Sequence, residues 1–223
     1  MKAVRIAPSI LAGDMGNLRR AVEQAVEGGA DLIHLDVIDG HFAPNITFGP
    51  GTVKSLRRVS SLPFDAHLMI SDPVAYAERF LDAGSDTLTV HAEVLNERRF
   101  AKLLRIVRTR GRRIGLALKP STPLPGWALR RLSDLDVLLV MTVNPGFSGQ
   151  TLDRKVLPKL QQLSRLAQRV SDEIDIEVDG GVDVGNASEV VKRGGTILVA
   201  GAAVYGTPDP IGAIRELRES CSP

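Results

Sequence analysis

The chain of 223 residues has little cysteine, few aromatic residues and no long apolar run. Its one cysteine, Cys221, excludes an internal disulfide and suits a reducing compartment. Aromatic residues make up 4% of the chain. The apolar run at 6–12 is too short to cross a membrane and is followed closely by Asp14. We therefore expect a cytoplasmic protein with no membrane partner.

The sequence also lacks an excess of one charge. It has 28 Lys and Arg against 26 Asp and Glu, a formal net charge of +2. Its densest basic cluster, at 108–113, straddles an expected helix end, where cations interact favourably with the helix dipole. We therefore expect no nucleic-acid partner.

Short segments rich in branched aliphatic residues predict eight strands, with helical spacing of apolar residues in most of the intervals between them. The predicted strands are 4–11, 32–37, 64–69, 87–91, 114–119, 137–143, 174–179 and 197–201. Glycines at 28–29, 84, 111 and 194–195 lie where the helices should end. Pro73 and Pro210 follow aspartates suited to capping a helix start.

Strands that alternate with helices pair in parallel through crossovers, and eight such units form a (β/α)₈ barrel. The alternative is a doubly wound open sheet, which would want a G-x-G-x-x-G loop after the first strand. The sequence there is "APSILAGDMGN". The only internal sequence similarity, between "DVIDG" and "EVDGG", is too short to indicate a repeat. We predict a single α/β domain over 1–223, a TIM barrel.

Polar residues lie where several predicted strands end. His34 and Asp36 interrupt an apolar strand at alternate positions, so they point to the same side and need a partner when buried. The carboxyl ends of barrel strands form the active site, which brings these two residues near three others. These are His67, Asp179 and Ser9. Two histidines with two aspartates suit Zn²⁺, Mn²⁺, Fe²⁺ or Co²⁺.

Two other histidines receive simpler interpretations. For His41 we favour a hydrogen bond within its loop, and for His91 a supporting contact behind the polar cluster. Glycine-rich stretches follow the last three strands: "NPGFSGQ" at 144–150, "DGG" at 179–181 and "AGAAVYG" at 200–206. Glycines let backbone N–H groups approach an anion, so these stretches together favour a phosphate site.

The chain resembles the ribulose-phosphate 3-epimerase family over nearly its whole length. The resemblance runs through "IAPSILAGD" (6–14), "HLDVIDGHFAPNITFGP" (34–50), "DAHLMI" (65–70), "MTVNPGFSGQ" (141–150), "EVDGGV" (177–182) and "VAGAAVYG" (199–206). It implies an isomerase of the pentose phosphate pathway that interconverts D-ribulose 5-phosphate and D-xylulose 5-phosphate. It also implies one divalent metal ion, with zinc favoured.

The resemblance implies a role for particular residues. The metal ligands would be His34, Asp36, His67 and Asp179, with Asp36 and Asp179 also the acid–base pair. The substrate-binding residues would be Ser9, His67, Met69, Met141, Gly146, Phe147, Ser148, Gly149, Gly180, Gly181, Gly201 and Ala202. The methionines have an alternative reading as gap-fillers of an apolar pocket.

Three positions depart from the family pattern. Ile38 replaces a methionine and keeps an apolar wall. Ser148 replaces a glycine, so we expect strain if the backbone there needs a glycine conformation. Ala202 replaces a serine and loses a hydroxyl that could donate to phosphate. The last two departures weaken the predicted phosphate site.

Epimerisation beside a ketone needs the proton on that carbon to be removed from one face and replaced on the other. Two carboxylic groups from distant strands can act on opposite faces, and a cation can stabilise the enediolate between the two steps. We therefore predict a metal-dependent two-base 3-epimerase.

Three other functions stay open. The first is a 3-epimerase of another ketose phosphate, such as allulose 6-phosphate. The second is a lyase of the orotidine-phosphate decarboxylase type, which would want an Asp-x-Lys-x-x-Asp arrangement, and "HLDVID" has no lysine. The third is a non-catalytic sugar-phosphate-binding barrel. A phosphorylated ketose is the expected partner, and we also expect a homo-oligomer.

Overall fold

The computed structural model describes residues 2–221, in which eight parallel strands curl into a barrel. Residues 1, 222 and 223 of the predicted 1–223 domain lie outside this range. The strands are β1 Arg5–Pro8, β2 Ile33–Ile38, β3 Phe64–Met69, β4 Thr87–His91, β5 Arg113–Leu118, β6 Val137–Met141, β7 Asp175–Asp179 and β8 Ile197–Ala200. Each predicted strand is present, and the predicted (β/α)₈ fold is confirmed.

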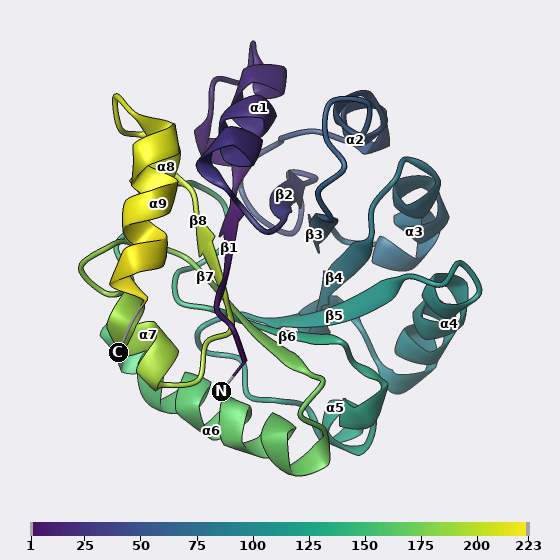
Figure 1. Cartoon of the computed structure of the whole chain (residues 1–223). Coiled ribbons are helices and arrows are strands. Elements are labelled where there is room, and N and C mark those ends of the chain that lie inside the picture. Colours follow the sequence, from purple (N-terminus) through teal and green to yellow (C-terminus); the bar gives the residue numbers. More distant parts are fainter. Residues whose placement is uncertain (1, 222–223) are drawn as a thin grey trace.

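Helices surround the strands on all sides (Figure 1). They are α1 Leu18–Gly28, α2 Pro50–Leu56, α3 Pro73–Asp82, α4 Glu97–Arg108, α5 Gly126–Arg130, α6 Leu157–Val170, α7 Ala187–Lys192, α8 Ala202–Tyr205 and α9 Pro210–Ser220. Short 3₁₀ turns occur at Ile10–Ala12, Ala92–Val94, Leu132–Asp134 and Arg154–Val156. The apolar faces of the helices and the outer faces of the strands form the main core.

The predicted helix signals act as expected. The Asp72 side chain accepts a hydrogen bond from Ala75 N at the start of α3, and Asp209 does the same for Gly212 N at α9. Gly29 ends α1 with a φ of 80°, a left-handed conformation that favours glycine. These caps fix the helix lengths and therefore the lengths of the loops that reach the barrel mouth.

The first strand is shorter than predicted. It ends at Pro8, and the chain turns at once into the 3₁₀ segment Ile10–Ala12. Ser9, between them, forms an isolated parallel bridge with His34. This bridge joins β1 to β2 and closes the ring of strands, so it brings Ser9 to the level of the polar residues of β2.

A fourfold repeat of hydrogen bonds ties the barrel together at the amino ends of its even-numbered strands. Asp86 precedes β4, accepts Phe64 N at 2.9 Å through its side chain and returns its own N–H to Phe64 O at 2.9 Å. The same exchange joins three more pairs of residues. They are Asp31 with Ile6, Asp136 with Ile114, and Thr196 with Ile176. The sequence alone did not reveal this repeat.

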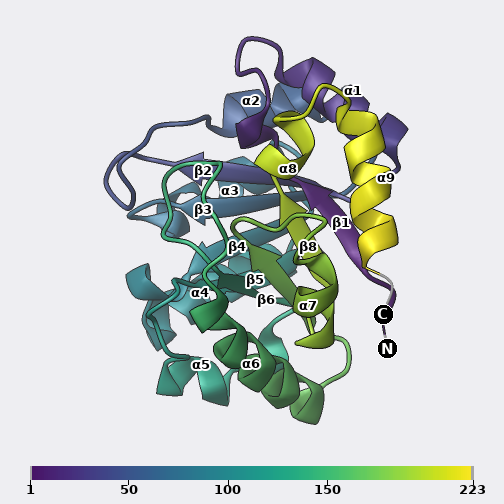
Figure 2. The same cartoon turned by 90° about the vertical axis from the view of Figure 1, so that its left-hand side faces the viewer.

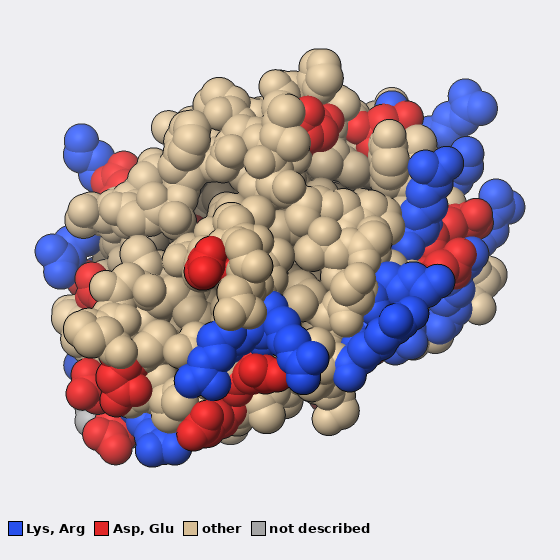
Figure 3. Space-filling model, turned by 90° about the horizontal axis from the view of Figure 1, so that it is seen from above, with Lys and Arg blue, Asp and Glu red and all other residues tan. Residues whose placement is uncertain are grey.

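Arginines pair with the aspartates of this repeat. Arg57 and Arg112 contact Asp86, and Arg108 contacts Asp136 at 2.7 Å. The basic cluster at 108–113 is thus engaged in ion pairs at the amino ends of the strands. In Figure 3, Lys and Arg gather on the right, the side of α2, α3 and α4 in Figure 1, with Asp and Glu among them.

We predict that Asp86→Ala lowers the free energy of unfolding by about 1–3 kcal/mol, because the buried Phe64 N–H loses its acceptor. Asp82→Ala is the control, since the side chain of Asp82 forms an exposed ion pair with Arg110, worth about 0–1 kcal/mol. Urea unfolding of both variants measures the difference. Equal stability of the two variants would contradict a structural role for the repeat.

Candidate metal centre and active site

The polar residues of β2, β3 and β7 face the inside of the barrel at its carboxyl end. The strand register places Asp36 beside His67 and Met141 beside Asp179. His34 and His67 are fully buried, and Asp36 is 5% exposed. The loop after β2 lies at this end, whereas β1 begins and α9 ends at the other (Figure 2). The alternation of His34 and Asp36 in an apolar strand therefore reflects a polar interior.

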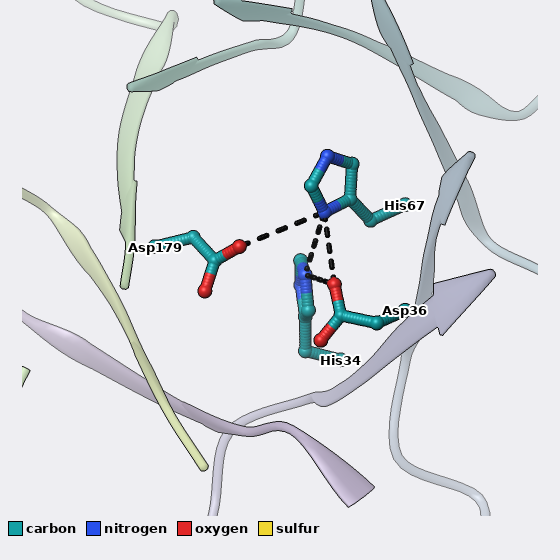
Figure 4. A group of neighbouring side chains, drawn as sticks. All are labelled: His34, Asp36, His67 and Asp179. Carbon is teal, nitrogen blue, oxygen red and sulfur yellow. Dashed lines mark hydrogen bonds and ion pairs between the residues drawn. The ribbon is translucent and has the colours of Figure 1, made fainter. Parts of the chain in front are cut away.

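Four side chains converge there on one point (Figure 4). His67 Nδ1 lies 3.0 Å from Asp36 Oδ1 and 3.3 Å from His34 Nε2. His34 Nε2 lies 3.3 Å from Asp36 Oδ1. The remaining ligand atom, Asp179 Oδ2, lies 3.7 Å from His67 Nδ1. Each of the four residues offers one ligand atom, and these atoms all lie within 4.8 Å of one another.

This cluster fits a divalent cation of the zinc type. Tetrahedral nitrogen and oxygen ligands at ~2.0–2.1 Å from a metal are separated from each other by roughly 3.3 Å. The measured separations of 3.0, 3.3, 3.3 and 3.7 Å lie around that value. Two imidazoles with two carboxylates are also the donor types that such metals take. The residues present can therefore hold the cation that the sequence predicts.

The two aspartates have pKa values on opposite sides of the ordinary value. Burial works to raise the pKa of Asp36, but His34 and then His67 hold it well below its usual range. Burial, and then the Asp36 carboxylate, raise the pKa of Asp179 to about 6. Without a cation, one carboxyl of the pair is therefore ionised where its partner can keep a proton, the division that acid–base catalysis needs.

The carboxylates around the centre also shift the pKa of His34. Burial works to lower its pKa, but Asp36 and Glu177 prevail and raise it well above the ordinary value. The centre therefore attracts positive charge, whether as a proton on His34 or as a metal ion. Ser9 completes the arrangement, since its hydroxyl donates to Asp36 Oδ2.

A second layer of buried polar residues lies behind the ligands, and the sequence analysis did not single it out. Glu177 is fully buried, with Oε1 at 3.2 Å from His34 Nδ1. Asp65 lies farther from that nitrogen, at 3.9 Å, and accepts from Thr89 Oγ1 at 2.9 Å. The available signal was the period of two, since Asp175, Glu177 and Asp179 alternate with Ile176 and Val178 along β7.

The two remaining histidines behave as interpreted. His91 is fully buried, with Nε2 at 2.9 Å from His67 Nε2 and Nδ1 at 3.0 Å from Glu93 Oε2. Burial lowers the pKa of His91 to about 4, so the ring is neutral. His41 lies in the exposed loop after β2, where its Nδ1 is 3.1 Å from Asp39 O. Neither belongs to the four converging ligands.

A cavity of about 270 Å³ opens over the two aspartates of this cluster. Asp36 and Asp179 lie in its wall, with Ile38, Met69 and Met141 forming an apolar part. Every predicted substrate-binding residue except His67 lines it: Ser9, Met69, Met141, Gly146, Phe147, Ser148, Gly149, Gly180, Gly181, Gly201 and Ala202. Further lining residues were not predicted from the sequence, among them Leu11, Val143 and Asp183.

The glycine loops form the other part of this cavity. Gly181 has a φ of 67°, and a Cβ there would lie 2.3 Å from Leu152 N, so the loops after β6 and β7 approach too closely for any side chain. Asn45 Nδ2 donates to Gly146 O at 2.8 Å and joins the loop after β2 to the loop after β6. Thr142 N donates to Asp179 O at 2.8 Å, which fixes the backbone that carries this aspartate.

Two of the departures from the family pattern lie in the glycine loops. Among the described residues only glycines have positive φ, so Ser148 occupies a conformation open to any residue. The condition for strain at Ser148 is therefore not met, because Gly146 and Gly149 take up the unusual backbone angles, with φ of 144° and 82°. Ala202 begins α8, where its backbone N–H points from the first turn of a helix.

The fold and the centre together define a (β/α)₈ barrel whose strand ends gather two histidines and two aspartates suited to a metal ion. The family model of the ribulose-phosphate 3-epimerase family matches residues 5–205. The chain belongs to this family.

Curated relatives agree along the whole chain. A ribulose-phosphate 3-epimerase of Bacillus subtilis is 43% identical over 219 residues, 97% of this chain and 99% of the relative. One of Synechocystis is 40% identical and covers 100% of this chain and 96% of the relative. Among solved structures, 3-hexulose-6-phosphate synthase from Salmonella typhimurium superposes with a TM-score of 0.72 at 18% identity, over 98% of each chain. At that identity the likeness concerns the fold alone.

Among residues 2–221, no helix has the length and apolar character that crossing a bilayer requires.

Proposed function

We propose that this protein is an isomerase that interconverts D-ribulose 5-phosphate and D-xylulose 5-phosphate by moving the proton on carbon 3. The observation that carries the proposal is the pair Asp36 and Asp179, which line one cavity from two strands that are not neighbours. Their opposite pKa shifts support one base and one acid in the same site. Membership of the epimerase family supports the choice of substrate.

The reaction needs a base on one face of carbon 3 and an acid on the other. We assign Asp36 to one face and Asp179 to the other, so that the ionised carboxylate removes the proton and the protonated partner supplies one. The roles exchange when the reaction runs in reverse. His34, Asp36, His67 and Asp179 would hold the cation, which when bound supplies Lewis-acid polarisation of the ketone.

Other residues would prepare the reacting atoms. The Ser9 hydroxyl donates to Asp36 and so limits the orientation of this carboxylate. Ile38, Met69 and Met141 form a buried apolar group that would exclude water from carbon 3. The methionines thus shape the pocket and exclude water from it, which fits their interpretation as side chains that fill gaps in an apolar pocket.

The phosphate of the substrate would bind on the glycine loops. The backbone after β6 would contribute Gly146, Phe147, Ser148 and Gly149, and the ends of β7 and β8 would contribute Gly180, Gly181, Gly201 and Ala202. The close approach of these loops and the positive φ angles of their glycines support an anion site built from backbone N–H groups.

Several finer assignments accompany this function. Zinc is the favoured cation because the donor set combines two imidazoles with two carboxylates. We place the enzyme in the cytoplasm and in the pentose phosphate pathway, which fits its single cysteine and its family. The expected absence of a nucleic-acid partner and the expected homo-oligomer stay predictions.

Incubation with ribulose 5-phosphate in deuterated water tests the function. We expect xylulose 5-phosphate to form with one deuterium on carbon 3, as measured by proton NMR. Deuterium exchange without a new epimer would contradict epimerisation, and binding without exchange would support a non-catalytic barrel. A lyase is disfavoured because the residues that line the cavity include no lysine within the described chain.

The same assay with allulose 6-phosphate tests the alternative substrate. We expect a lower kcat/KM for this six-carbon sugar, since the extra carbon must fit between the metal ligands and the glycine loops of a 270 Å³ cavity. A higher kcat/KM for the six-carbon sugar would make it the substrate and would leave the two-base chemistry unchanged.

A further inference from the structure

Two buried or half-buried glutamates lie behind the metal centre and take no part in the proton transfers. Glu177 is fully buried on β7, and neither of its carboxylate oxygens makes an aligned hydrogen bond with any described residue. Glu93 follows β4, with a side chain that is 19% exposed, and accepts Lys119 N at 2.8 Å through Oε1. Buried carboxylates are costly unless they serve a partner, so each calls for an explanation.

We propose that Glu177 and Glu93 fix the ring tautomers of the two histidine ligands, Glu177 directly on His34 and Glu93 through His91 on His67. The inference deepens the proposed function and rests on its metal centre. Both glutamates are positioning residues, because neither touches the substrate or the cation.

The direct contact determines the state of His34. An ionised carboxylate attracts an N–H and repels a lone pair, so Glu177 favours the tautomer of His34 that carries its hydrogen on the nitrogen 3.2 Å from Oε1. That nitrogen is Nδ1. The neutral ring that binds a cation has one N–H, and its Nε2 then presents a lone pair. Nε2 is the atom that lies 3.3 Å from both Asp36 Oδ1 and His67 Nδ1.

The same reasoning applies to two successive contacts on the path from Glu93 through His91 to His67. Glu93 Oε2 accepts from His91 Nδ1 at 3.0 Å, which leaves His91 Nε2 as an acceptor. His67 Nε2, 2.9 Å away, must then donate to it. The lone pair of His67 is consequently on Nδ1, the atom 3.0 Å from Asp36 Oδ1. The stacked rings of His67 and His91, with centroids 5.0 Å apart, keep this path in place.

The two chains of contacts have one consequence at the centre. Nε2 of His34 and Nδ1 of His67 face each other at 3.3 Å as two lone pairs, beside carboxylate oxygens that are also acceptors. With both rings neutral, no proton joins these atoms, so a cation is the group that satisfies all of them together. Outer carboxylates of this kind contribute about 10–100-fold to metal affinity in other proteins. The two contacts therefore select the nitrogen that each neutral ring offers to the cation.

Nitrogen-15 NMR of the histidine rings in the zinc-loaded protein tests the tautomers without any substrate. We expect hydrogen on Nδ1 of His34 and on Nε2 of His67. Glu177→Leu should remove the preference at His34 and weaken Zn²⁺ binding by about 10–100-fold in competition with a chelator. Glu93→Leu should affect His67 instead, and by less, because the effect passes through His91. Glu97→Leu, in an exposed ion pair with Arg130, is the matched control.

Conservative variants keep the test decisive where a leucine variant does not fold. Glu177→Gln retains a weaker acceptor, so it should keep the His34 tautomer and an affinity between those of the native and leucine proteins. Hydrogen on Nε2 of native His34, or unchanged Zn²⁺ affinity in Glu177→Leu, would overturn the inference. So would two Zn²⁺ ions per chain, because His34, Asp65 and Glu177 could form a second cation group.

These measurements separate the inference from the function. A protein with the expected tautomers and a single Zn²⁺ site that fails to epimerise ribulose 5-phosphate would refute the function alone. A protein that epimerises the sugar while Glu177→Leu leaves both the tautomer and the affinity unchanged would refute the positioning roles alone.

Discussion

Replacing Asp179 with asparagine is expected to lower kcat for epimerisation by about 10²–10⁴-fold, the usual contribution of a general acid or base. The amide keeps the size of the side chain and an oxygen for the cation, but it can neither remove nor supply a proton. Asp36→Asn should lose activity on the same scale. Steady-state rates in both directions measure the loss.

The two variants should differ in what activity they retain. Each keeps one base, so each should still exchange the carbon 3 proton of one epimer with deuterated water, although it cannot form the other epimer. Asp179→Asn and Asp36→Asn should act on opposite epimers, because the two carboxylates face opposite sides of carbon 3. This pairing distinguishes two bases from a single base that serves both faces.

Metal content must accompany these rates, since both aspartates also belong to the proposed ligand set. Variants that hold one cation per chain and lose epimerisation support the acid–base roles. Asp134→Asn, at a half-buried aspartate paired with Arg131 away from the cavity, is the control for the substitution itself. Near-native epimerisation by a metal-loaded Asp179→Asn protein would refute the two-base assignment.

The sequence predicted the barrel because its signals are local and repeated. Each strand is a short aliphatic run, and capping residues such as Asp72 and Asp209 lie beside the helices that they start. The end of β1 was misjudged because Ile10 and Leu11 continue its apolar composition beyond Ser9. There the bridge from Ser9 to His34 and the turn at Ile10–Ala12 decide the conformation.

The four converging side chains could be predicted because a parallel barrel brings all its strand ends to one mouth. The layer behind them could not be predicted in the same way. The function of Glu177 depends on a 3.2 Å contact with His34 across the barrel, and that of Glu93 on two successive imidazole contacts. Such distances follow from strand register and side-chain rotamers, which no spacing in the sequence reveals.

The fourfold hydrogen-bond repeat was hidden for a related reason. Its members are Asp31, Asp86, Asp136 and Thr196, and each precedes an even-numbered strand. Three of them lie two residues after a glycine of positive φ, but Asp136 does not, and a hydroxyl replaces the carboxylate in the fourth. The repeat becomes visible in the hydrogen bonds that these side chains accept from backbone N–H groups of the preceding strand.

Withdrawal of the metal should abolish epimerisation and also destabilise the fold. Two lone-pair nitrogens and two carboxylates converge within 4.8 Å, so without the cation His34 must take up a proton that does not polarise the ketone in the same way. A ligand at 100 times its Kd stabilises the native state by about 2.7 kcal/mol, which corresponds to a Tm shift of about 5–10 °C in a chain of this size. Calorimetry and turnover before and after chelation measure both effects.

The metal ions that restore turnover and Tm to the chelated protein identify the kind of site. Zn²⁺, Mn²⁺, Fe²⁺ or Co²⁺ should restore both turnover and Tm, because each accepts imidazole with carboxylate. Mg²⁺ is the matched control of equal charge, and it should restore little, since it prefers oxygen ligands in an octahedron and keeps its water. Full turnover by the chelated, metal-free protein would remove the cation from the mechanism. Equal restoration by Mg²⁺ would show that His34 and His67 do not act as ligands, and it would leave the two aspartates as the functional core of the site.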